Sequence, residues 1–113
     1  MSHEIFKVVL LDAKHAIVRD ATVSEGSLTL SIVHPREVFT MAVKESAAAV
    51  IFLHNHPSGD PTPSQEDRVL TARLVSAGEV LGIRVLDHIV VGDGRYVSFA
   101  DQGWLNESGR LEI

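Results

Sequence analysis

Two histidines separated by one residue stand where an apolar run gives way to a proline-rich segment. Residues 50–53 are all apolar, His54-Asn55-His56 follows, and three of the four prolines of the chain come within the next seven residues. In an extended chain, residues i and i+2 face the same side. His54 and His56 are therefore expected to converge on one point, with Asn55 facing the other way. Two converging imidazoles could bind a metal ion, or they could be ordinary hydrogen-bonded surface residues.

A helix start follows the proline-rich segment. Thr62-Pro63-Ser64-Gln65 favours Thr62 as the N-cap, Pro63 at the first helical position and Gln65 completing a capping box. This interpretation leaves Ser64 and Asp67 free, and their spacing of three puts them on one helix face. In the alternative, Ser64 is itself the cap and Asp67 bonds back to its amide.

The combination His54-x-His56-x7-Ser64-x2-Asp67 predicts a metal site, although each residue alone has an ordinary structural explanation. A strand end and a helix start would bring two imidazoles and one carboxylate to a single cation. Such a set leaves the fourth position open, which is the arrangement of catalytic zinc sites. The chain contains no cysteine, so thiolate ligands and a cysteine nucleophile are excluded.

The elements that would position these side chains follow from periodicity and turn residues. Pro35 is expected to open a short helix, and Gly82 to end a longer one whose apolar stripe is Leu70, Leu74, Ala77 and Leu81. The alternation of apolar residues and the turn signals predict the other elements as strands. The expected order is strands 5–11, 16–23 and 28–33, helix 35–45, strand 50–53, helix 63–81, and strands 83–91 and 96–99. This order predicts an α/β domain with a mixed sheet packed by two helices.

Composition limits the class of protein. With 113 residues, of which 45% are hydrophobic, the chain is expected to form one domain over 1–113. No apolar run is long enough to span a membrane and no signal peptide is recognisable, so a cytoplasmic location is expected. The net charge is −5 and the ten Lys and Arg residues are scattered, which argues against nucleic-acid binding by this domain alone.

The motif resembles a known family. His-x-His-x7-Ser-x2-Asp is similar to the signature of the JAMM (MPN+) metalloproteases, and the surrounding HNHPSGDPTPS, with LDHIVVG downstream, resembles the bacterial RadC family in particular. The resemblance extends from about Glu4 to Trp104. It implies a cytidine-deaminase-like (JAMM/MPN) α/β sandwich, in agreement with the expected element order.

The resemblance also implies roles for particular residues. His54, His56 and Asp67 would bind one Zn²⁺ per chain, Ser64 would stabilise the oxyanion, and a water would attack the carbonyl of a peptide or isopeptide bond. JAMM enzymes place a glutamate base just ahead of the first core strand. Glu4 fits that place and is preferred here over Glu37, which lies in a first helical turn where an acid already has a structural reason to be.

Two functions remain open at this point. The first is a zinc metallopeptidase of the JAMM type, and the second is a zinc-site domain with a structural or partner-binding role. RadC proteins usually carry an N-terminal helical segment that this chain lacks, so the chain is expected to be a short member or an excised domain. The RadC name is associated with DNA repair, but no residue pattern here supports DNA contact. His88 is expected to be a structural histidine, with a supporting role behind the ligands as the alternative.

Overall fold

The computed structural model describes residues 3–26 and 33–105. Its elements run β1 (Ile5–Leu11), β2 (Ile17–Glu25), α1 (Pro35–Lys44), β3 (Ala49–Asn55), α2 (Gln65–Leu81), β4 (Arg84–Gly92) and β5 (Arg95–Ser98). Within the described ranges the strands form one five-stranded sheet in the order β2-β1-β3-β4-β5. The α/β class, the mixed sheet and the two helices predicted from the sequence are confirmed. The predicted strand at 28–33 lies outside the described residues except for Val33.

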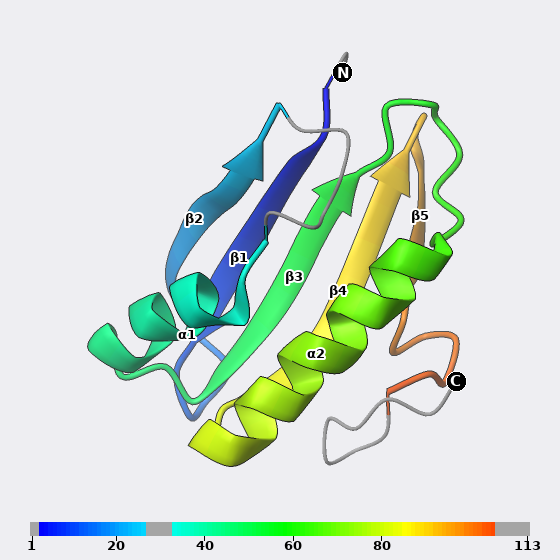
Figure 1. Cartoon of the computed structure of the whole chain (residues 1–113). Helices are drawn as coiled ribbons and strands as arrows, with labels where there is room; N and C mark the ends of the chain where they lie inside the picture. Colours follow the sequence, from blue (N-terminus) through cyan, green and yellow to red (C-terminus); the bar gives the residue numbers. More distant parts are fainter. Residues whose placement is uncertain (1–2, 27–32, 106–113) are drawn as a thin grey trace.

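The sheet is mixed because only one of its strand pairs is parallel. β3 and β4 run parallel and are connected through α2, whereas β1 pairs antiparallel with both β2 and β3. Figure 1 shows both helices on the same side of the sheet, with α2 lying along β3 and β4. The carboxyl ends of β3 and β4 and the start of β1 therefore lie at the same end of the sheet, beside the first turn of α2.

Apolar residues of the strands and helices form one core between the helices and the sheet. Alternate residues of β1 and β3 point into it, as the period of two requires. In α1, Val38, Phe39 and Ala42 are buried. In α2 the predicted stripe is confirmed for Leu70 and Leu74, which are buried, and is wrong for Leu81, which is 49% exposed at the end of the helix.

The two ends of α2 are fixed by different devices. Gly82 adopts the left-handed conformation (φ 71°) and ends the helix as predicted. At the other end the predicted cap is wrong, because α2 begins at Gln65 with Ser64 as its N-cap. Thr62 is occupied elsewhere, since its hydroxyl and its amide both donate to Oδ1 of Asp60, at 2.7 and 3.0 Å. Asp60 thus closes a turn before the helix starts.

Candidate metal centre

β3 delivers two imidazoles to its carboxyl end. His54 is the last residue of β3 that faces the core, and it is fully buried. His56 follows two residues later, just after the end of the strand, with its side chain 15% exposed. The chain is still held by the sheet at this point, because the amide of His56 donates to the carbonyl of Val91 at 2.8 Å. Nδ1 of His56 lies 2.9 Å from the carbonyl oxygen of Asp60. A carbonyl can only accept, so Nδ1 carries a proton and donates to it, while Nε2 of the same ring faces Asp67.

The carboxylate of Asp67 faces both imidazoles from the first turn of α2. Its oxygens lie 3.1 Å from Nε2 of His54 and 3.0 Å from Nε2 of His56, and the residue is only 1% exposed. Burial alone would raise the pKa of Asp67, but the imidazole of His54 and the amide of Ser64 outweigh it and hold that pKa well below its usual range. Asp67 is therefore a carboxylate at neutral pH.

Ser64 and Asp67 form a capping box. Oγ of Ser64 accepts from the amide of Asp67 at 3.1 Å, and Oδ2 of Asp67 accepts from the amide of Ser64 at 2.6 Å. The interpretation in which both side chains are free of capping is wrong, and the alternative with Ser64 as the cap is confirmed. Because the Ser64 oxygen is the acceptor, its own hydroxyl proton is not used in that bond.

Glu4 reaches the same point from the start of β1. Its side chain is 12% exposed, and Oε2 lies 3.6 Å from Nε2 of His54. Burial raises the pKa of Glu4 above its usual value, and the nearby imidazole of His54 offsets this only in part. Glu37 is exposed on α1 and does not belong to the group of possible ligands found among the described residues.

The side chain of Asn55 holds the segment that carries Glu4. It points away from the two histidines, as predicted; its Oδ1 accepts from the amide of Ile5 at 2.6 Å, and its Nδ2 donates to the carbonyl of His3 at 3.0 Å. These two hydrogen bonds fix the backbone on either side of Glu4. Asn55 thus holds Glu4 opposite the two histidines, a role that local sequence could not reveal.

These four side chains fit a cation. The possible ligand atoms of Glu4, His54, His56 and Asp67 all lie within 4.8 Å of one another. Nε2 of His54 is buried and makes no hydrogen bond of good geometry among the described residues, although Oδ1 of Asp67 lies 3.1 Å away. A buried ring nitrogen without a partner is costly unless something binds it. Imidazole nitrogens with carboxylate oxygens are a donor set that zinc accepts.

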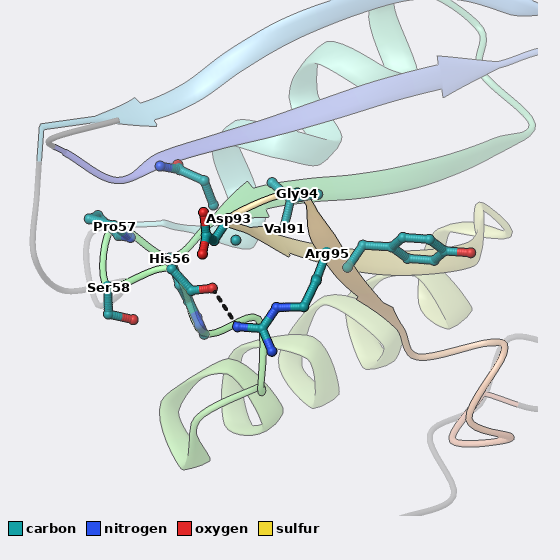
Figure 2. A pocket seen from close by; sticks show the side chains of 11 residues that line it. His56, Pro57, Ser58, Val91, Asp93, Gly94 and Arg95 are labelled. Carbon is teal, nitrogen blue, oxygen red and sulfur yellow. Dashed lines mark hydrogen bonds between the residues drawn. The ribbon is translucent and has the colours of Figure 1, made fainter.

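Two cavities border this group. One, of about 410 Å³, is lined by Glu4, His56, Pro57, Ser58, Ser64, Glu66 and Asp67. The other, of about 670 Å³, lies between the loop after β3 and the β4–β5 turn (Figure 2). Figure 2 shows Arg95 reaching across this second cavity, where its Nη2 donates to the carbonyl of Gly59 at 3.1 Å. His56, Pro57 and Ser58 line both cavities, so the two cavities adjoin the same loop beside the candidate metal centre.

The α/β fold and the donor set are compatible with the JAB/MPN class of domains. The sequence matches the family described as the RadC-like JAB domain over residues 1–104, and the chain belongs to this family. Within the described ranges, no helix is both long and apolar enough to cross a membrane.

Curated relatives carry names without a stated activity. A UPF0758 protein of Pelobacter propionicus is 68% identical over 102 residues, which cover 90% of this chain and 44% of the relative. One from Trichlorobacter lovleyi is 66% identical and one from Methanosarcina mazei is 57% identical, with the same coverage. The chain thus spans less than half the length of these relatives.

Proposed function

We propose that this domain is a zinc-dependent metallopeptidase of the JAMM type, which hydrolyses a peptide or isopeptide bond. The observation that carries the proposal is the convergence of two imidazoles, a buried carboxylate and a second acid of raised pKa beside an open cavity. A purely structural metal site would need no acid with raised pKa and no open cavity.

His54, His56 and Asp67 would hold the zinc ion. Each is fixed before any metal arrives: His54 by the sheet, His56 through Asp60, and Asp67 by the capping box. Ligands that are already ordered lose little conformational entropy on binding. When bound, zinc polarises a carbonyl and lowers the pKa of a coordinated water from about 15.7 toward about 7.

Glu4 would act as the general base. A base is most effective when its pKa lies near the working pH, and burial moves the pKa of Glu4 in that direction. Its carboxylate lines the same cavity as Ser64 and Asp67, so it can take a proton from the attacking water and pass it to the leaving amine. The geometry alone would also allow Glu4 to be a fourth ligand, and the experiment below separates these roles.

Ser64 would stabilise the oxyanion that forms on the substrate carbonyl. Its oxygen is tied to the amide of Asp67, which orients the hydroxyl, while the hydroxyl proton stays available to donate. An oriented donor of this kind is worth about 10²–10³ in rate.

The test combines metal content with hydrolysis of a broad peptide library. We expect about one zinc per chain in the wild type, and loss of zinc under chelator competition in His54→Ala and Asp67→Ala. Glu4→Gln should keep zinc and lower the rate by about 10²–10⁴-fold, whereas the matched variant Glu37→Gln should change the rate little.

Three outcomes would contradict parts of this proposal. Loss of zinc in Glu4→Gln would make Glu4 a ligand, and the reverse ranking of the two glutamine variants would move the base to Glu37. A wild-type protein that binds zinc tightly but cleaves no library member would favour the alternative, a zinc-site domain with a structural or partner-binding role.

A further inference from the structure

A buried hydrogen-bonded chain lies directly behind His54, on the side away from the cavity. Nδ1 of His54 is 2.8 Å from Nε2 of His88 on β4, and Nδ1 of His88 is 2.5 Å from Oγ1 of Thr71 on α2. Oγ1 of Thr71 is in turn 2.7 Å from the carbonyl oxygen of Asp67. His88 and Thr71 are both fully buried, so no water competes for these bonds.

The direction of every hydrogen bond in this chain follows from its last acceptor, the carbonyl of Asp67. A carbonyl can only accept, so the Thr71 hydroxyl donates its one proton to Asp67 and must accept from His88. In the neutral ring of His88 the one proton is therefore on Nδ1, which leaves Nε2 of that ring as an acceptor. His54 must then donate from Nδ1, and its Nε2 is the atom that faces Glu4 and Asp67.

The ring of His88 is also held against rotation. It stacks on Phe99, with ring centroids 4.9 Å apart and the planes at 16°, and it meets the rings of Phe6 and Phe52 edge-on. Its backbone is fixed by Asp87, whose Oδ1 accepts from the amide of His88 at 2.7 Å. The ring thus cannot turn to exchange its two nitrogens without disturbing the core.

We propose that Thr71 and His88 are positioning residues of the metal centre, which fix the tautomer of His54 so that its Nε2 lone pair is presented to the cation. This proposal rests on the proposed zinc site. Partners behind a ligating histidine orient the ring and raise its basicity, and losing them typically weakens metal binding by about 10–100-fold. Asp67 contributes twice, because its carboxylate faces the site while its carbonyl sets the direction of the chain.

The experiment measures zinc affinity by chelator competition and ring protonation by ¹⁵N NMR on the whole chain. His88→Leu removes the acceptor at similar volume, and we expect the affinity for zinc to fall about 10–100-fold. His88→Gln should restore most of it, because its amide oxygen can accept from Nδ1 of His54. Val75→Ala is the control for lost stability: Val75 is buried one turn beyond Thr71 in α2 but has no polar group to join the hydrogen bonds, so the affinity should stay unchanged.

Thr71→Val gives the sharper result because Thr71 does not touch His54. Without the hydroxyl, His88 can move its proton to Nε2 and donate to Nδ1 of His54, which is the wrong tautomer for metal binding. We expect a smaller loss of zinc affinity than in His88→Leu, a shift of the His88 proton from Nδ1 to Nε2 in the spectrum, and recovery in Thr71→Ser.

The results separate this proposal from the proposed function. Wild-type affinity in both His88→Leu and Thr71→Val, or a wild-type His88 protonated at Nε2, would overturn the positioning role whether or not the protein is a peptidase. If the wild type bound no zinc, the proposed function would fail. The NMR spectrum of the metal-free protein would still decide the tautomers, with His54 and His88 both expected to carry a proton at Nδ1.

Discussion

At the scale of single residues, the site combines groups with two simultaneous tasks. Ser64 caps α2 and keeps a free hydroxyl proton, and Asp67 completes the capping box while facing both histidines. Such double use means that a substitution can change stability and activity together. Informative variants must separate the two effects.

Replacing Ser64 with glycine and with alanine should separate capping from chemistry. Alanine is a poor N-cap and should lower the free energy of unfolding by about 1 kcal/mol, whereas glycine should cost only a few tenths. Both lack the hydroxyl, so both should lose about 10²–10³ in peptidase rate. The measurements are urea unfolding and hydrolysis rates, with Thr62→Ala as the control that keeps the full rate. A large loss of rate in Ser64→Ala alone would assign the effect to the cap.

The raised pKa of Glu4 makes a prediction about pH. In the unfolded chain this acid ionises near 4.5, but in the folded protein burial delays ionisation to higher pH. As the pH rises from below 4.5 through the folded pKa, the unfolded state releases its proton first and the wild type loses stability. Glu4→Gln has no such loss, so the metal-free variant should melt at a higher temperature than the wild type at pH 7. The difference should vanish at pH values where Glu4 is protonated in both states, and a persistent difference there would contradict the assignment.

At the scale of elements, the site forms where three of them meet. The end of β3 supplies the histidines, the first turn of α2 supplies the carboxylate, and the start of β1 supplies Glu4. β1 runs antiparallel to β3 with Phe6 opposite His54, so the beginning of one strand lies beside the end of the other. The position of Glu4 at the site therefore depends on how the first residues of β1 are held.

Asn55→Ala tests how the start of β1 is held. The change leaves the amide of Ile5 and the carbonyl of His3 without partners, and we expect the free energy of unfolding to fall by about 1–3 kcal/mol. Zinc affinity should change little, because β1 and β4 still hold β3, but the hydrolysis rate should fall as Glu4 loses its fixed position. Lys7→Ala is the control: Lys7 also lies on β1, and the change removes only its exposed ion pair with Asp20 of β2, so neither quantity should change. An unchanged rate in Asn55→Ala would show that Glu4 needs no such clamp.

At the scale of the whole molecule, the candidate metal centre lies at one end of the apolar core. The core lies between the helices and the sheet, and the four side chains of the centre gather where β3 ends, with the ring of His54 stacked on Phe6 of the core. The domain should therefore fold without metal and gain stability when metal binds. The chain covers less than half the length of its curated relatives.

Removing zinc should lower the melting temperature without unfolding the protein. Free zinc at 100 times its dissociation constant adds about 2.7 kcal/mol to the free energy of unfolding. For a domain of this size that corresponds to a shift of about 10 °C. Circular dichroism with and without a chelator measures the shift, and His54→Ala should show little of it. Loss of the helical signal at room temperature on chelation would contradict a core that is independent of the metal.

The sequence by itself determined the features that depend on local spacing. The i, i+2 positions in an extended strand brought His54 and His56 together, and periodicity gave the two helices and the mixed sheet. The cap of α2 could not be chosen this way, because Thr62 with Gln65 and Ser64 with Asp67 both fit the capping pattern. Only the turn formed by Asp60 decided it, by occupying the hydroxyl of Thr62.

Only the tertiary structure decided the contacts between residues distant in the sequence. Glu4 faces His54 because strand pairing brings together residues 50 positions apart, and Asn55 holds that segment in register. Thr71 lies on α2 and His88 on β4, and no local pattern encodes how these two elements are placed against each other. Their hydrogen bond forms because α2 packs at one particular position along β4, which the packing of the whole core sets.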